Sequence, residues 1–143
     1  MKKIITVICA ALFIFPLFAQ ANCPAIEKIY CSRTFGGLSC GSDYPGWVGG
    51  ALTSGTDSTV KKFMMVTWFD VGNHEASVRC LYSGDKNGVI VLHEGNFGAV
   101  SVPTSKPFFW LIWKKGYRII DGNGYPTLTC AAGINVCEFK YTG

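Results

Sequence analysis

Six cysteines constrain the fold of this chain more than any other feature. They lie between residues 23 and 137, and a seventh, Cys9, belongs to a leader that we expect to be removed. Cysteines in a short exported chain usually form disulfides, because the compartments beyond the inner membrane are oxidising. The sequence therefore predicts a small disulfide-stabilised domain, and its bridging cysteines are Cys23, Cys31, Cys40, Cys80, Cys130 and Cys137.

The N-terminus has the pattern of a signal peptide. Lys2 and Lys3 form a positive start, residues 4–18 are apolar, and residues 19–21, Ala-Gln-Ala, match the small-x-small cleavage rule. Cleavage after Ala21 would remove residues 1–21 and leave residues 22–143, which is 143 − 21 = 122 residues, a length that fits a single domain. We therefore expect a chain that is exported through the inner membrane and is periplasmic or secreted.

The charge that remains after cleavage excludes some classes of partner. Without Lys2 and Lys3 the chain has 13 − 2 = 11 basic and 9 acidic residues, a net charge of about +2. This is too little to neutralise the several phosphates that a nucleic-acid footprint requires. No later apolar run approaches about 18 residues, and the residues before Cys23 lack a lipoprotein box. We expect neither a nucleic-acid partner nor a membrane anchor.

One disulfide can be predicted from local pattern. Alternation around Cys130 and Cys137 places Cys130 on the same face as Leu128, and Cys137 on the same face as Phe139. Turn residues lie between the two cysteines, so they are expected to face each other across a hairpin and to form a bridge. The other four cysteines would form two bridges that tie a loop-rich N-terminus to the body, and they are Cys23, Cys31, Cys40 and Cys80.

From residue 60 onward the chain alternates between short β-prone runs and turn signals. A cadence of about ten residues per strand is typical of an antiparallel sandwich or small barrel, so we predict an all-β fold. Before residue 60 we expect one short strand near residues 28–32, followed by loops. The predicted strands are 60–69, 75–82, 88–93, 107–113, 117–121, 127–131 and 136–141, and the turns between them include 114–116 and 121–124.

The segment 107–113, Pro-Phe-Phe-Trp-Leu-Ile-Trp, is apolar at odd and at even positions, which would face opposite sides of a sheet. A half-exposed strand should alternate, so the first interpretation is a central strand buried on both faces. The alternative is that one face, formed by Phe108, Trp110 and Ile112, is an exposed aromatic platform for a protein or glycan. Trp47, in a glycine-rich segment, would either extend this platform or close one end of the core.

Motifs that carry catalysis or bind metal are weak in this sequence. Two His-Glu pairs, at His74 and His93, lack the i, i+4 spacing of a helical zinc site and are better explained as exposed turn residues. No Cys-x-x-Cys occurs. Residues 121–124 resemble the start of a calcium loop, but a hairpin turn explains them fully. We expect no metal, no cofactor and no enzymatic activity; a hydrolase that uses His74 or His93 is the least favoured hypothesis.

Several short motifs resemble a family of small exported, disulfide-containing domains of unknown function from intracellular gammaproteobacteria, some of which are type II secretion substrates. The resemblance is carried by residues 23–26, 46–49, 63–68, 78–82 and 137–139. It implies export and a small β-rich fold, and it implies no reaction, because the family offers no catalytic motif to transfer. Cys31 and Cys40 have no place in that pattern.

The leading hypothesis from the sequence is a secreted, monomeric binding module without enzymatic activity, a candidate virulence-associated effector. It would contact a protein or glycan of a host or of the envelope through an aromatic surface that includes Trp47, Phe108 and Trp110. The alternative is a periplasmic inhibitor of a hydrolase such as lysozyme, because small disulfide-bearing β domains suit rigid loop insertion into a cleft.

Overall fold

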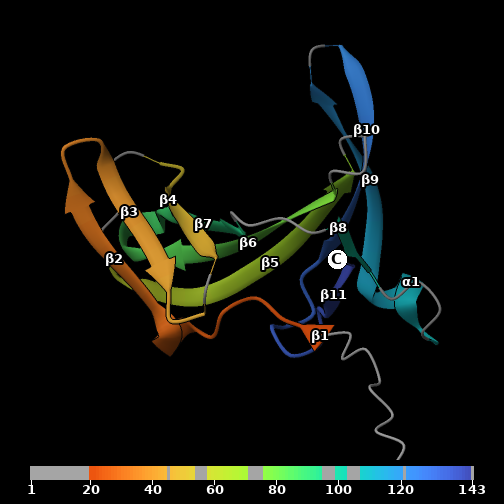
Figure 1. Ribbon diagram of the computed structural model, residues 1–143, viewed down its shortest axis with the longest axis horizontal. Coiled ribbons are helices and arrows are strands. Elements are labelled where there is room, and N and C mark those ends of the chain that lie inside the picture. Colours follow the sequence, from red (N-terminus) through yellow and green to blue (C-terminus); the bar gives the residue numbers. More distant parts are fainter. Residues whose placement is uncertain are drawn as a thin grey trace, which may run out of the picture.

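An antiparallel sheet of eight strands spans the part of the chain that the structure, a computed structural model, describes (Figure 1). The described residues are 20–44, 46–53, 58–70, 76–94, 99–102, 107–120 and 122–142. From one edge to the other the strands are β2 (Ile29–Thr34), β3 (Gly37–Ser42), β4 (Trp47–Ala51), β7 (Val89–Glu94), β6 (Ala76–Gly84), β5 (Val60–Asp70), β10 (Asn123–Cys130) and β9 (Trp113–Ile120).

A smaller sheet covers part of the large one. Its described strands are β1 (Gln20–Ala21), β11 (Phe139–Thr142) and β8 (Ala99–Ser101), in the order β1-β11-β8. The short helical elements are η1 (Ile26–Lys28), η2 (Asp85–Asn87) and α1 (Phe109–Ile112). The prediction of an all-β antiparallel fold is thus confirmed. Residues 1–19 of the predicted leader lie outside the described residues, and β1 consists of the last two residues before the predicted cleavage site.

The two faces of the large sheet differ in character, as the period of two along a strand requires. Val66, Cys80 and Leu92 are register partners on neighbouring strands, and all are fully buried. We call their side the core face. One residue along, Thr67, Arg79 and His93 form the next row of partners and are half-buried. We call their side the open face.

The core forms between the core face and the small sheet. Phe139 of β11 is fully buried and meets the Trp47 ring edge-on, with ring centroids 6.2 Å apart. Burial of such large rings is the main stabilising term available to a domain of this size. The other large core residues include Val66, Val78, Tyr82, Ile90, Leu92, Phe109, Trp113 and Leu128.

All six cysteines that follow the predicted leader are paired in three disulfides. The predicted bridge Cys130–Cys137 is present, although it does not cross a hairpin: β10 belongs to the large sheet and β11 to the small one. Cys31–Cys40 joins register partners of the β2–β3 hairpin. Cys23–Cys80 ties the N-terminal segment to the central strand β6.

The tie between the N-terminal segment and β6 has a second component. Two residues beyond Cys80, the Tyr82 hydroxyl donates a buried hydrogen bond of 2.7 Å to the Pro24 carbonyl oxygen. Burial raises the pKa of the Tyr82 phenol, so its hydroxyl stays protonated and remains a donor. The N-terminus is therefore held over the core face by one covalent and one polar contact from the same strand.

Two sequence predictions about residues 107–116 are wrong. Residues 107–113 are not a central strand: Phe108 adopts a left-handed conformation with φ of 65°, and α1 follows. Phe109 turns inward and stacks on Trp113, with ring centroids 6.0 Å apart. The apolar residues at both parities thus reflect a helical turn with one buried and several exposed side chains. The turn predicted at 114–116 is instead a continuous part of β9, paired with residues 127–129 of β10.

The segment after Ser32 contains more strand than its composition suggests. The strand expected near residues 28–32 is present as β2, but β3 and β4 follow in place of loops. Glycines disfavour strands, and here they serve close packing. A Cβ atom at Gly49 would lie 1.9 Å from the Val91 carbonyl oxygen, and one at Gly50 would lie 2.2 Å from the Leu38 carbonyl oxygen. Only glycine fits these strands against their neighbours.

The close approach at Gly49 predicts a site-specific loss of stability. Gly49→Ala should lower the free energy of unfolding by about 2–3 kcal/mol, because a backbone atom of β7 would have to move. Gly36→Ala is the matched control: no atom lies within 4 Å of a Cβ at Gly36, and a change below about 0.5 kcal/mol is expected. Urea denaturation measures both. Equal effects at the two positions would contradict the close approach.

Candidate functional site: an exposed aromatic edge

The structure separates the three residues that the sequence offers as ligand-binding candidates. Phe108 and Trp110 are exposed at the turn before α1 and within α1. Trp47 is only 6% exposed and packs against Phe139 in the core. Trp47 therefore closes one end of the core, and it is not available to a ligand. Ile112, the third member of the predicted platform, is half-buried against the core.

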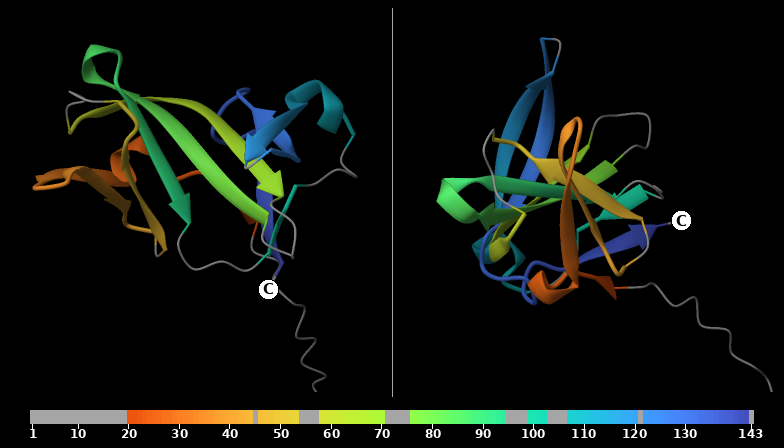
Figure 2. Two further views of the ribbon diagram at one scale, coloured as in Figure 1. Left: turned by 90° about the horizontal axis from the view of Figure 1, so that it is seen from above. Right: turned by 90° about the vertical axis from the view of Figure 1, so that its left-hand side faces the viewer.

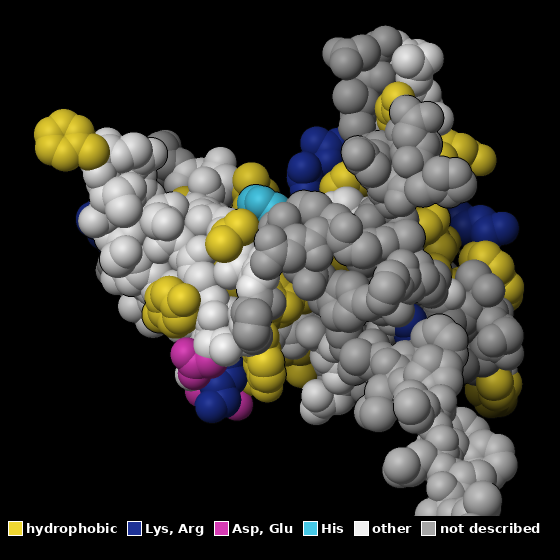
Figure 3. Space-filling model, viewed as in Figure 1, with side chains coloured by type: hydrophobic (Ala, Val, Ile, Leu, Met, Phe, Trp, Pro, Cys, Tyr) yellow, Lys and Arg dark blue, Asp and Glu magenta, His cyan; other side chains and the backbone are white. Residues whose placement is uncertain are grey.

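Large exposed apolar side chains gather instead along α1 and β9. Their exposed fractions range from 51% for Trp110 to 81% for Tyr117. Figure 3 shows hydrophobic side chains clustered at the side of the molecule where α1 and β9 lie. We call this surface the aromatic edge, and its members are Phe108, Trp110, Leu111, Tyr117 and Ile119.

Local geometry explains why these side chains stay in solvent. Tyr117 pairs with Pro126, and Ile119 pairs with Gly124, on the outer half of the β9–β10 hairpin. This half projects from the body (Figures 1 and 2). Side chains on the core-face side of the strand therefore point to solvent there. Gly122, at the turn between the strands, has a φ of +80° that favours glycine.

A positive charge borders the aromatic edge. The Lys115 ammonium lies 4.4 Å from the centroid of the Trp110 ring, within the range of a cation–π contact. This contact links β9 to α1. Lys115 shares its face with Tyr117 and Ile119, which are two and four residues further along the strand. Lys115 thus lies between Trp110 of α1 and the exposed side chains of the outer half of β9.

β9 is an edge strand of the large sheet. Within the described residues it pairs with β10 alone, so one side of its backbone is free of strand partners. Lysines at positions 114 and 115 are of the kind that protects an edge from unwanted pairing. Tyr117 and Ile119 do not serve that purpose, because exposed apolar side chains on an edge strand promote pairing. The outer half of β9 is therefore suited to a specific contact.

Of the two histidines considered for catalysis, the structure describes only His93. His93 lies within β7, between Val48 and Arg79 in the sheet register, and is half-buried. His74 lies outside the described residues. Among the residues that the structure describes, no three His, Cys, Asp or Glu side chains are grouped so that they could hold a metal ion. In the same part of the chain, every helix is too short or too polar to cross a membrane.

Sequence reasoning missed one cluster on the open face. The Phe69 ring lies 4.9 Å from the Arg79 guanidinium and 5.6 Å from that of Arg118. Phe69 is only 6% exposed although it does not face the core. These residues come from three strands, and their positions in the sequence do not predict that they are in contact. Only the register of β6, β5, β10 and β9 brings them together.

Comparison with known proteins adds no relative: no family model, no curated protein and no solved structure matches this chain. The resemblance to small exported domains of gammaproteobacteria stays a prediction.

Proposed function

We propose that this protein is an exported binding module, without enzymatic activity, that recognises a protein partner through the aromatic edge. The observation that carries the proposal is the set of five large apolar side chains on β9, on α1 and at the turn before α1, each more than half exposed. A concentration of exposed apolar side chains commonly marks an interaction site, because water solvates apolar surface poorly. Trp and Tyr are also the side chains that most often dominate binding energy.

Two features of the aromatic edge favour a protein over a glycan as the partner. Leu111 and Ile119 are aliphatic, and they suit the apolar centre of a protein interface. Within the described residues one side of the β9 backbone has no strand partner, so it can accept an added strand from another protein. This recognition mode combines main-chain hydrogen bonds with pockets for alternate side chains. A glycan could use the aromatic rings alone.

The disulfides support export. Cys80, Cys130 and Cys137 are fully buried in bridges that close the core, and such bridges persist in oxidising compartments. Together with the predicted leader over residues 1–21, they favour a protein of the periplasm or of the external medium. Secretion through a type II system is the further step that the family resemblance suggests.

Site-specific photo-crosslinking tests the proposal. A photoreactive phenylalanine analogue is placed at Tyr117, and the exported form of the protein is irradiated. We expect one dominant adduct with a partner protein, because Tyr117 lies inside the aromatic edge. The matched control is the same analogue at Phe35, which is fully exposed at the β2–β3 turn, at the opposite edge of the large sheet. With the partner identified, Trp110→Ala should weaken its binding by about 2 kcal/mol, roughly 30-fold. Phe35→Ala should leave binding unchanged.

Three outcomes would contradict the proposal. The same adducts at Tyr117 and Phe35 would mean that the aromatic edge has no special role. A carbohydrate adduct would favour the glycan hypothesis. A cross-link to a second copy of the chain, together with a dimer that Trp110→Ala converts to a monomer, would make the aromatic edge a self-association interface.

A further inference from the structure

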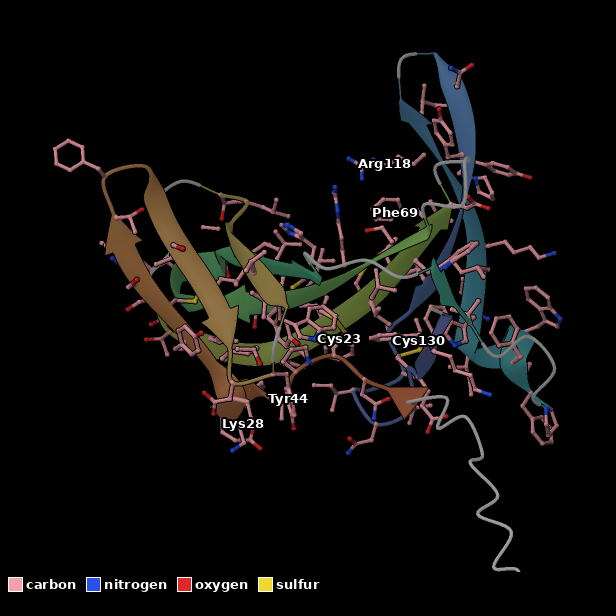
Figure 4. The ribbon with its side chains drawn as sticks, viewed as in Figure 1. Cys23, Lys28, Tyr44, Phe69, Arg118 and Cys130 are labelled. Carbon is pink, nitrogen blue, oxygen red and sulfur yellow. A yellow bond between two sulfur atoms is a disulfide. The ribbon has the colours of Figure 1, made fainter. Side chains whose placement is uncertain are left out.

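Two arginines meet over one aromatic ring on the open face of the large sheet. The guanidinium carbons of Arg79 and Arg118 lie 4.9 Å and 5.6 Å from the Phe69 ring centroid. Figure 4 places Phe69 and Arg118 on the side of the sheet that lies between the β2–β3 and β9–β10 hairpins. In Figure 3, Lys or Arg and His side chains border the recess between these two ends of the sheet.

Sheet register explains how the two guanidiniums reach the same ring. Arg79 is the partner of Thr67, two residues from Phe69, and so lies diagonally across from the ring. On the other side, Phe69, Thr127 and Gly116 are partners in one row. Gly116 has no side chain, and a Cβ atom there would lie 2.9 Å from the Thr127 hydroxyl oxygen. Arg118 can therefore extend over Gly116 and Thr127 to the ring.

This arrangement places two like charges side by side. Burial lowers the pKa of Arg79, and the positive charge of Arg118 lowers it further. Two ion pairs among the described residues, Lys28–Asp43 and Lys61–Asp85, involve neither arginine. No described Asp or Glu occupies a register position on the open face. A bound anion would relieve the repulsion.

The floor beside the arginines offers neutral donors. Thr67, Thr127 and Thr129 are half-buried on the open face, and their hydroxyl groups can donate hydrogen bonds. The row that contains Thr67 and Thr129 runs from His93 and Arg79 at one end to Lys114 at the other. Positive charges thus flank a strip of small hydroxyl residues from both sides, in a recess rather than on a convex surface.

We propose that Arg79 and Arg118, over the threonine floor, bind one oxyanion group: a carboxylate, a phosphate or a sulfate. The planar fork of a guanidinium matches such groups in a bidentate manner, and two forks held on one ring are already oriented. Contact with Phe69 reduces the side-chain entropy that each arginine would lose on binding. This site lies on the opposite face of the sheet from the core, and it does not depend on the aromatic edge.

Thermal denaturation of the oxidised protein in series of sodium phosphate, sulfate and acetate tests the site. Sodium chloride keeps the ionic strength constant. A ligand that binds the native state raises the melting temperature in a saturable manner. We expect such a rise for at least one oxyanion, with an apparent Kd that increases about tenfold or more in Arg79→Gln and in Arg118→Gln. Arg79→Lys, which keeps the charge and loses the fork, should fall between wild type and Arg79→Gln.

The control variant is Lys62→Gln, which removes one positive charge from an exposed position elsewhere on the open face. It should respond as the wild type does. The salt that raises the melting temperature at the lowest concentration shows whether the site prefers tetrahedral anions (phosphate, sulfate) or a planar one (acetate). The same stabilisation of wild type and both Arg→Gln variants, or no saturable effect of any salt, would overturn the proposal. Because Arg118 is exposed, Arg118→Gln still decides the matter if Arg79→Gln does not fold.

Discussion

The double variant Cys23→Ala/Cys80→Ala should lose about 4 kcal/mol of unfolding free energy. Its cysteines are 57 residues apart in sequence, and a bridge stabilises mainly by restricting the unfolded chain, more so for a longer loop. Both cysteines are also buried, so their removal leaves a defect in the core. This loss approaches the whole stability of a small domain, and the variant is expected to be partly unfolded at 37 °C.

The matched control for this variant is Cys31→Ala/Cys40→Ala. That bridge spans only 9 residues, within one hairpin. The expected loss is between about 2 and 3 kcal/mol. Denaturation in guanidinium chloride, followed by circular dichroism, compares the two variants. A larger loss for the hairpin bridge than for Cys23–Cys80 would contradict the view that β6 anchors the N-terminal segment.

We further expect Trp47→Ala to lower the free energy of unfolding by about 3–5 kcal/mol. Trp47 is buried at one end of the core and contacts the Phe139 ring edge-on at 6.2 Å. Its replacement by alanine would remove a large apolar side chain and leave a cavity between the two sheets. Part of the small sheet, which packs through Phe139, should loosen with it.

Trp110→Ala is the natural comparison, since it removes the same side chain from the surface. Trp110 is 51% exposed, and its contacts include Lys115 and Phe109. We expect a loss below about 1 kcal/mol. Urea denaturation of both variants distinguishes a structural tryptophan from one available for binding. Similar losses at both positions would mean that Trp110 belongs to the core, and the aromatic edge would lose its central residue.

Much of the fold follows from local patterns. Strands at 60–69 and 88–93 were predictable because β-branched and aromatic residues lie between turn signals there. The bridge Cys130–Cys137 was predictable from the alternation around it. The strands β3 and β4 were not, because glycine lowers strand propensity while it also permits the close approach of neighbouring backbones. Residue propensities include the low tendency of glycine to form strands. The close approach of backbones is seen only when the strands are packed together.

The candidate surface was predictable in composition and not in location. An exposed aromatic platform was only the alternative to a buried strand, and the sequence did not distinguish Trp47 from Trp110. In segment 107–113, apolar residues at both parities suit a buried strand and a short helix equally well. In the structure Phe109 packs on Trp113, the segment forms a short helix instead of a strand, and Phe108, Trp110 and Leu111 are exposed.

The sequence alone determined the class of this protein: a predicted leader, six remaining cysteines and a cadence of short strands are local properties, and they lead to a disulfide-stabilised antiparallel β domain. The tertiary structure alone decided which residues meet. Phe69, Arg79 and Arg118 are distant in the chain, and two of the three disulfides join cysteines whose pairing the sequence left open. The physical reason is that strand register, which sets every contact across a sheet, depends on the packing of all strands together.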